Sequence, residues 1–298
     1  MPHSSGKTGF LYLPPYRVQG LSVAGEHTTV QVPELDITFD VGLCPRIILN
    51  SPFIAISHGH MDHLGGLPYY FSQRMFQKMG VGTAVCHPDL AGPLQDMMRS
   101  WVPIENQRTR HTILPLCPGE KLEIKNNIFL HAFETSHTVA SQGYAVVEER
   151  SKLKLEFRDL SQDQLRELKK GGTEITEIHE IPLVAYTGDT EIGPYLYQDL
   201  VARAQIVITE CTFFEEEHRS RAAVGKHIHV SDLGPLLDAW EAESVVLCHL
   251  SRRSMISDAR RMIDGMYGES HPGRVHILMD HRTNRVRYEQ QAGARDSE

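Results

Sequence analysis

Apolar and polar residues alternate along the first part of the chain, in the pattern typical of half-buried β-strands. The stretch TTVQVPELDITFDVG, residues 28–42, alternates around Pro33 and predicts a β-hairpin. The run PFIAIS, residues 52–57, is almost continuously apolar and predicts a short buried strand. A helical pattern follows from Gly66 to Met79 and ends at Gly80.

Short strands and helices alternate along the remainder of the chain. The residues Ser161 and Gln164 have the spacing of a helix capping box, with Gly171 past the helix end. Strand-rich stretches with interspersed helices predict an α/β (α+β) fold with two sheets covered outside by helices. The further expected strands are 83–86, 121–124, 128–133, 143–149, 154–157, 182–188, 205–210, 244–249, 274–280 and 285–289, and the further expected helices are 89–101, 161–170, 193–203, 231–242 and 257–266.

Composition narrows the class of protein. The 298 residues are 41% hydrophobic, which is ample for a substantial core. The formal net charge of −8 means that the electrostatic field of the whole molecule does not favour binding of nucleic acid. Five scattered cysteines without CxxC pairing indicate a reducing compartment, so we expect a cytoplasmic protein. The N-terminus shows no apolar leader core, and no apolar run reaches the roughly 20 residues of a membrane span.

The stretch SHGHMDHLGG, residues 57–66, concentrates metal-ligand chemistry directly after a predicted buried strand. His58, His60, Asp62 and His63 place four ligand-type side chains within six residues. If the chain stays extended, His58 and His60 point to one side, which would suit a shared metal ion. Asp62 and His63 would then serve a second ion. Imidazole and carboxylate ligands together suit zinc.

Ligand-type residues also follow three later strands. His137 lies after the strand at 128–133, Asp189 after the strand at 182–188, and His249 at the end of the strand at 244–249. Each residue alone is weak evidence for a metal site, because single histidines and aspartates are common on protein surfaces. Together with the loop they complete the ligand set of a two-metal site.

These motifs resemble a known family. HGHMDH is similar to the HxHxDH signature of the metallo-β-lactamase superfamily, and the order of the later ligands is similar to its dinuclear pattern. The resemblance extends to ribonuclease Z, the endonuclease that trims tRNA 3′ ends. It covers most of the chain, from about Gly42 to Arg253. The segments that carry it are HTVASQGYAVVE (137–148), YTGDT (186–190), TECTFF (209–214) and VVLCHLSRR (245–253).

The resemblance implies a four-layer αββα sandwich with two mixed sheets, in a single domain over residues 1–298 with a short insertion at about 149–182. It also implies a homodimer and two divalent ions, Zn²⁺ foremost, although Mn²⁺ and iron accept the same ligands. A bridging water or hydroxide would attack the substrate, with Asp62 accepting its proton. The implied ligands are His58, His60 and His137 for one ion, Asp62, His63 and His249 for the other, and Asp189 as the bridge.

The resemblance also implies a proton donor for the leaving group, oriented by a glutamate at position 210. In ribonuclease Z the donor is the histidine of an HST turn. Here the turn reads KHIHVSDL, and His229-Val230-Ser231 fits the H-x-(S/T) form, with Ser231 as a helix N-cap. We therefore expect Asp62, Glu210 and His229 as catalytic residues. His227 is the alternative donor, because its distance from the last ligand fits the family better.

The chain departs from the ribonuclease Z pattern at three points. DVGLCP (40–45) stands where the family has DCGEGTQ, Thr209 replaces a histidine, and the interval at 149–185 is short. That interval mixes acidic residues with basic ones, so a solvated helix and hairpin describes it better than a tRNA-gripping arm. Its basic residues are Lys152, Lys154, Arg158, Arg166, Lys169 and Lys170.

The prediction is thus a dinuclear metal-dependent hydrolase, foremost a ribonuclease Z-like phosphodiesterase that cleaves precursor tRNA or a smaller phosphodiester. The alternative is a hydrolase of a small non-phosphate substrate such as a lactone or thioester. A phosphodiester is favoured, since its poor alkoxide leaving group requires a general acid. A non-catalytic metal-binding protein is a third reading, which the complete ligand set disfavours.

Overall fold

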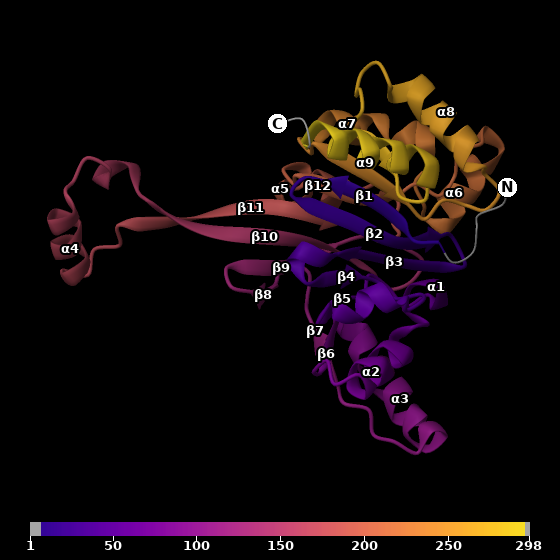
Figure 1. Cartoon of the computed structure of the whole chain (residues 1–298), viewed down its shortest axis with the longest axis horizontal. Coiled ribbons are helices and arrows are strands. Elements are labelled where there is room, and N and C mark those ends of the chain that lie inside the picture. The colour runs from indigo at the N-terminus through magenta and orange to yellow at the C-terminus, as the bar shows by residue number, and fades with distance from the viewer. Residues whose placement is uncertain (1–6, 296–298) are drawn as a thin grey trace.

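The computed structural model describes residues 7–295, which form two mixed β-sheets stacked between layers of helices (Figure 1). The first sheet pairs its strands in chain order, with antiparallel pairs up to β4 and parallel pairs beyond it. Its strands are β1 (Gly9–Leu13), β2 (Tyr16–Val23), β3 (His27–Val32), β4 (Ile37–Phe39), β5 (Phe53–Ala55), β6 (Gly82–Cys86) and β7 (His111–Pro115).

The second sheet repeats this scheme, with antiparallel pairs up to β11 and parallel pairs beyond it. Two mixed sheets of seven strands confirm the predicted αββα arrangement. The strands are β8 (Lys121–Lys125), β9 (Ile128–Glu134), β10 (Gln142–Leu153), β11 (Thr176–Tyr186), β12 (Ile206–Glu210), β13 (Ser244–Cys248) and β14 (Val275–Ile277).

Three apolar clusters separate the four layers. The cluster between the sheets joins residues of both, such as Phe39 and Tyr186, whose rings stack 4.8 Å apart. Two further clusters lie between each sheet and its helices. The inner parallel strands β12 and β13 are buried at every position, which explains their nearly continuous apolar sequences.

Most of the helices cover the outer faces of the two sheets. Leu67 and Phe71 from α2 pack with β5 and β6, while Leu236 and Ile263 from α7 and α8 pack with β12 and β13. Within the described residues, no helix combines the length and apolarity needed to cross a membrane. The α-helices are α1 (Met61–Leu64), α2 (Leu67–Phe76), α3 (Pro88–Glu105), α4 (Gln162–Lys170), α5 (Asp199–Ala202), α6 (Arg219–Gly225), α7 (Gly234–Ala239), α8 (Ile256–Tyr267) and α9 (His281–Arg295), and short 3-10 turns cover Pro33–Leu35, Arg46–Asn50, Leu155–Phe157, Pro194–Tyr197, Glu216–His218 and Val230–Asp232.

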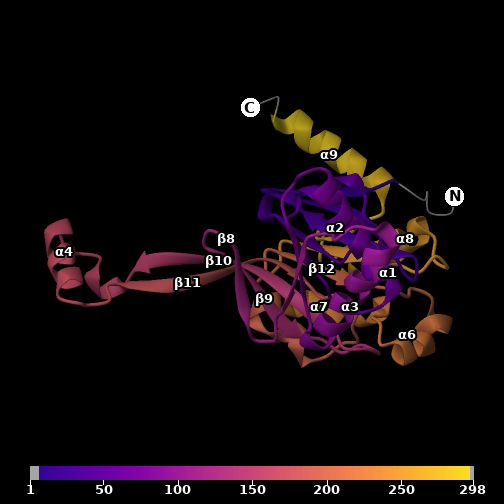
Figure 2. The same cartoon turned by 90° about the horizontal axis from the view of Figure 1, so that it is seen from below.

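Strands β10 and β11 continue past the sheet as a two-stranded hairpin that stands away from the body, with α4 at its far end (Figures 1 and 2). We call residues 148–181 the arm. The capping box at the start of α4 is confirmed, because Ser161 N donates to Gln164 Oε1 at 2.8 Å and Gln164 N donates to Ser161 Oγ at 3.4 Å. The arm spans almost the whole interval that we expected as an insertion.

Two predicted strands are wrong. Residues 154–157 fall after the end of β10, where Lys154 N donates to the Ile175 carbonyl at 3.0 Å and the chain turns into a 3-10 helix at Leu155–Phe157. Residues 285–289 lie within α9. There Tyr288 contacts Phe10 of β1, with ring centroids 5.4 Å apart, whereas the other apolar residue, Val286, is 48% exposed, so the alternation of charged and apolar residues does not mark one buried face. The expected helices at 193–203 and 231–242 form only as shorter pieces.

Candidate metal centre

The ends of strands from both sheets meet at one edge of the sandwich. His58 follows β5 of the first sheet, whereas His137, Asp189 and His249 follow β9, β11 and β13 of the second. The carboxyl ends of neighbouring parallel strands share an edge, so chemistry placed after each strand converges. The short helix α1, directly after His60, adds Asp62 and His63 to this edge.

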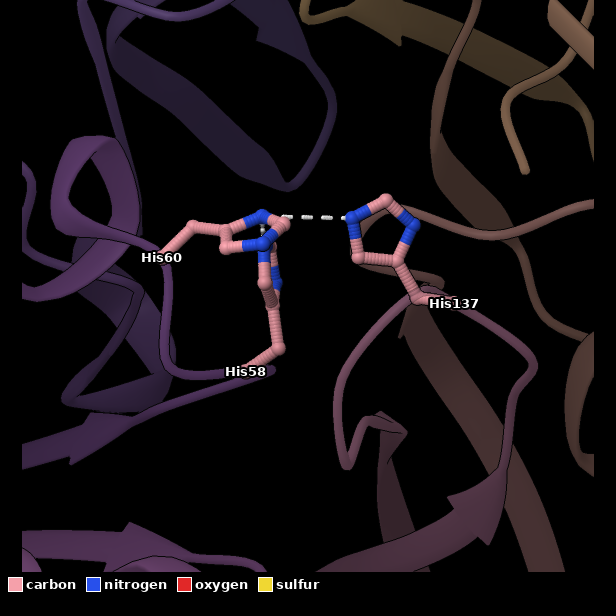
Figure 3. A group of neighbouring side chains, drawn as sticks. All are labelled: His58, His60 and His137. Carbon is pink, nitrogen blue, oxygen red and sulfur yellow. Dashed lines mark hydrogen bonds between the residues drawn. The ribbon is translucent and has the colours of Figure 1, made fainter. Parts of the chain in front are cut away.

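Three of the histidines form one cluster. The Nδ1 atom of His60 lies 3.0 Å from Nε2 of His58 and 3.3 Å from Nε2 of His137 (Figure 3). The rings come from two different loops and point their nitrogens at a common region. Three imidazole nitrogens at this spacing form a ligand group suited to one cation.

Asp62, His63 and His249 form a second group beside the first. The Oδ2 atom of Asp62 lies 3.4 Å from Nε2 of His249 and 3.8 Å from Nε2 of His63. The ligand atoms of all three lie within 4.8 Å of one another. A carboxylate with two imidazoles is again a common set for a divalent cation.

Asp189 joins the two groups. Its Oδ2 atom lies 3.2 Å from Nε2 of His249, 3.3 Å from Nε2 of His63 and 3.9 Å from Nε2 of His58. The side chain is almost fully buried. The structure therefore brings together all seven residues that the sequence predicts as ligands.

Hydrogen bonds on the opposite side of each ring leave one nitrogen free for a cation. The Nδ1 atoms of His58, His63 and His249 lie 3.0 Å from Ser57 Oγ, 2.8 Å from Asp40 Oδ2 and 2.9 Å from Thr212 Oγ1. Such partners fix the ring and direct Nε2 into the site. His63 Nε2 is buried without a hydrogen-bond partner, an arrangement that costs free energy unless a cation is bound there. The residues thus fit a pair of divalent cations.

The electrostatics of the groups agree with this fit. Burial, followed by the neighbouring His63, holds the pKa of His58 well below its ordinary value, which keeps the ring neutral. Burial alone would lower the pKa of His63, but the carboxylates Asp189 and Asp40 raise it well above the ordinary value. A cation at Nε2 would replace that proton and satisfy the same carboxylates.

Asp40 is a site residue that the sequence analysis mentioned only as part of the divergent DVGLCP loop. Its Oδ1 accepts from Ser57 N at 2.7 Å. Its Oδ2 accepts from Ser57 Oγ at 2.7 Å, Tyr186 OH at 2.6 Å and His63 Nδ1 at 2.8 Å. The available signal was its position directly after β4, which matches the other strand-end ligands.

Glu210 lies buried at the end of β12 and pairs with His227, not with His229. His227 Nδ1 lies 2.8 Å from Glu210 Oε1, and the ring stacks on His249 with centroids 5.3 Å apart. Burial alone would lower the pKa of His227, but the Glu210 carboxylate and then Asp189 raise it to about 9. The ring is therefore protonated at neutral pH.

His229, the favoured proton donor from the sequence, does not join the cluster. Its Nδ1 lies 2.8 Å from Ser231 Oγ and also accepts from Ser231 N at 3.3 Å, while Nε2 donates to the Glu215 carbonyl at 3.1 Å. Both ring nitrogens are used in holding the turn at Val230–Asp232. The geometry thus favours the alternative, His227, over His229.

Comparison with known proteins agrees with this geometry. The model of the beta-lactamase superfamily domain matches residues 50–250. The protein tRNase Z TRZ1 of Arabidopsis thaliana is 31% identical over 258 residues, covering 84% of this chain and 91% of that protein. The chain belongs to the tRNase Z family. The chloroplastic tRNase Z TRZ2 of the same plant is 32% identical over 252 residues, covering 83% of this chain and 71% of that protein.

Solved structures support the fold of this tRNase Z family member. Human tRNase Z, short form (ELAC1), matches with a TM-score of 0.57 at 18% identity, covering 92% of this chain and 96% of that one. The metallo-beta-lactamase fold protein YhfI of Bacillus subtilis also has a TM-score of 0.57, at 13% identity, covering 91% and 94%. These matches confirm the predicted sandwich. The protein is a ribonuclease Z-like, metal-dependent hydrolase.

Proposed function

We propose that this tRNase Z family member is an endoribonuclease that cleaves the 3′ extension of precursor tRNA with two divalent ions, foremost Zn²⁺. The observation that carries the proposal is the position of His227, whose Nδ1 lies 2.8 Å from Oε1 of the buried Glu210 and whose ring stacks on His249 beside the two ligand groups. Relatives named tRNase Z support the same substrate. Cleavage of a phosphodiester expels an alkoxide, which needs a general acid, whereas a thioester expels a thiolate that does not.

The ligand groups would hold one ion with His58, His60 and His137 and the other with Asp62, His63 and His249, bridged by Asp189. Bound there, the two ions would lower the pKa of an attacking water and stabilise charge on the phosphate. Imidazole-rich sets with carboxylates favour zinc, while manganese and iron accept the same donors.

The chain's own residues would move the protons. Asp62 would accept a proton from the attacking water. His227 would donate its Nε2 proton to the departing 3′ oxygen, because Glu210 occupies its Nδ1. Glu210 is itself fixed by Thr190 N and Ile228 N, which donate to its two oxygens at 2.9 and 3.2 Å. This places the donor ring in one orientation before the substrate arrives.

The arm supports an RNA-sized substrate. It stands away from the body as a long hairpin, a shape that a small-molecule hydrolase does not need (Figure 2). Lys152, Lys154 and Arg158 lie on its outer half and offer cations to a phosphate backbone. Its acidic side chains moderate that charge, so we infer that the arm positions tRNA through shape as well as charge. The solvated helix and hairpin that the sequence favoured is what the structure forms here, and tRNA binding by it is part of this proposal.

A homodimer stays a prediction from the family resemblance, and so does a cytoplasmic location. Helices α2 and α3 carry apolar side chains that a second copy would cover, namely Tyr69, Phe76 and Ile104, which are 55%, 80% and 69% exposed. Light scattering on the purified protein distinguishes a monomer from a dimer.

The deciding experiment compares cleavage of a 3′-extended precursor tRNA with cleavage of a bis-aryl phosphodiester by the metal-loaded protein. We expect one accurate cut after the discriminator nucleotide, with loss of that cut in His227→Ala. His229→Ala is the matched control two residues away and should retain activity. Aryl ester cleavage without tRNA cleavage would contradict the proposed substrate. Absence of both activities in protein with two bound metals would contradict the proposed chemistry.

A further inference from the structure

A cavity lies between α8, β14 and the start of α9, in a part of the chain that follows the metal ligands. Its volume is about 260 Å³. Among its walls are Arg260 and Tyr267 of α8, His276 of β14, and Asn284 and Arg287 of α9. None of these residues belongs to the ligand groups or to the Glu210–His227 pair.

Arg287 is a cation without a counter-ion at this cavity. Across residues 7–295, no carboxylate oxygen lies within 4.0 Å of its guanidinium nitrogens; its one hydrogen-bond contact is His276 Nε2, 3.4 Å from Nη1. The Nε atom is buried with no partner at all. The side chain of Arg287 is half-buried, and a buried unsatisfied N–H such as that of Nε costs free energy unless a partner binds to the group.

The neighbouring groups do not supply the missing anion. His276 is neutral, because burial, followed by Arg287 and Arg260, lowers its pKa to about 3. Asp280 is taken by Arg260, with Oδ2 3.2 Å from Nε. Asp264, the carboxylate on the cavity wall, is 63% exposed and lies 3.8 Å from Arg260 Nη1, so solvent screens it. Because Asp280 compensates Arg260 and His276 is neutral, Arg287 is left as the positive charge that no neighbouring carboxylate among the described residues offsets.

The start of α9 forms one wall of the cavity and is held in place by Asn284. Asn284 is anchored, since its Nδ2 donates to the carbonyls of Ile277 and Leu278 at 3.0 and 3.1 Å. This anchor holds the first turn of α9 against β14. The exposed Thr283 beside it lines the cavity and presents a hydroxyl. A guanidinium with several free N–H groups is the side chain that best matches a tetrahedral oxyanion.

We propose that this cavity binds a phosphate group through Arg287, at a site separate from the metal centre. The shared chemistry is a phosphate monoester or diester, carried by a free small molecule or by an RNA end. The cavity is too narrow for a duplex. A phosphate bound there would accept hydrogen bonds from Arg287 and would link α9 to α8. The inference stands whether or not precursor tRNA is the substrate.

The direct test is an anomalous difference map from metal-loaded crystals soaked in tungstate, a phosphate analogue. We expect a peak next to Arg287 as well as any peak at the metal ions. The peak next to Arg287 should vanish in Arg287→Gln and persist in Arg285→Gln. Arg285 is the matched control, because it is on the same helix, is exposed and pairs with Glu289. A peak confined to the metal ions, in wild type, would overturn the proposal.

Solution measurements distinguish a real site from binding at crystal concentration only. Orthophosphate, adenosine monophosphate and a short single-stranded RNA are each titrated into the metal-loaded protein, with binding followed by calorimetry. We expect Arg287→Gln to weaken the binding of at least one of these three ligands at least tenfold, and Arg287→Lys to weaken the binding of the same ligand less. Thermal melting without ligand shows that the variants are folded. Affinities unchanged in both folded variants would overturn the proposal. A loss limited to RNA would assign the site to an RNA phosphate, and a loss limited to the small molecules would assign it to a free ligand.

Discussion

His227 Nδ1 lies 2.8 Å from Oε1 of Glu210, a carboxylate that is fully buried at the end of β12. Each residue alone is ordinary, but together they hold a protonated imidazole against a cluster of five histidines and two aspartates. Through this pair Glu210, which is not among the proposed ligands, sets the orientation and raises the pKa of the proposed proton donor His227.

The pH dependence of cleavage follows from this pair. The pKa of His227 is raised to about 9, so the ring is protonated below that pH and loses its proton as the pH rises through it. Cations bound nearby lower this value. We therefore expect the rate to fall on the alkaline side, at about pH 9 or lower. In Glu210→Gln burial dominates, so the falling limb should move to lower pH. A pH–rate profile with an unmoved limb would contradict this role for Glu210.

The choice between the two neighbouring histidines is testable by direct substitution. His227→Ala should lower kcat for a precursor tRNA by a factor of about 10²–10⁴, the usual contribution of a general acid. His229→Ala should leave kcat within a few-fold and instead lower the free energy of unfolding by about 1–3 kcal/mol, because it removes a buried ring and its hydrogen bonds to Ser231 and Glu215. Single-turnover rates and chemical denaturation measure the two effects. The reverse pattern would restore His229 as the donor.

Metal content tests the two ligand groups. His63→Ala removes a ligand from one group and leaves His58, His60 and His137 intact. We expect the metal content, measured by mass spectrometry after dialysis, to fall from two ions per chain to one. Asp62→Asn should have a similar but smaller effect. An unchanged stoichiometry in His63→Ala would contradict the two-metal arrangement.

Asp40 should matter for metal affinity even though it is not a predicted ligand. It holds His63 through Nδ1 and also accepts from Tyr186 OH and Ser57. Asp40→Ala should weaken metal binding by about 10–100-fold, the usual effect of removing a ligand's hydrogen-bond partner. Asp36→Ala, on the same hairpin but exposed, is a suitable control. Equal metal affinity in Asp40→Ala and wild type would contradict the positioning role.

Shortening the arm separates substrate binding from chemistry. Replacing residues 150–178 with a two-residue turn removes α4 and the outer hairpin and leaves the sheet register of β10 with β9 intact. We expect KM for precursor tRNA to rise at least tenfold, with the bis-aryl phosphodiester cleaved at the original rate. A variant that cleaves tRNA as well as the full chain would show that the arm does not bind the substrate.

The sequence alone was sufficient to predict the fold and the seven residues that the structure brings together as proposed ligands. His58, His60, Asp62 and His63 are adjacent in the chain, and the remaining ligands each follow a recognisable apolar strand, so local pattern is sufficient to find them. The strand predicted at 285–289 shows the limit of that pattern, because these residues lie in α9, where Tyr288 packs on Phe10 of β1 and Val286 is exposed. Alternating charge along a chain does not reveal which neighbour supplies the contacts.

Only the tertiary structure favours His227 over His229 as the proposed donor, places Asp40 beside His63 and shows the arm. The two histidines are two residues apart in a turn, so spacing places either near the metal centre, and the position of Glu210 on a different strand selects one. Asp40 acts through partners 17 to 146 residues away. Arg287 is likewise notable only for the partner that it lacks. Such roles depend on distances between segments far apart in the chain, which local pattern does not contain.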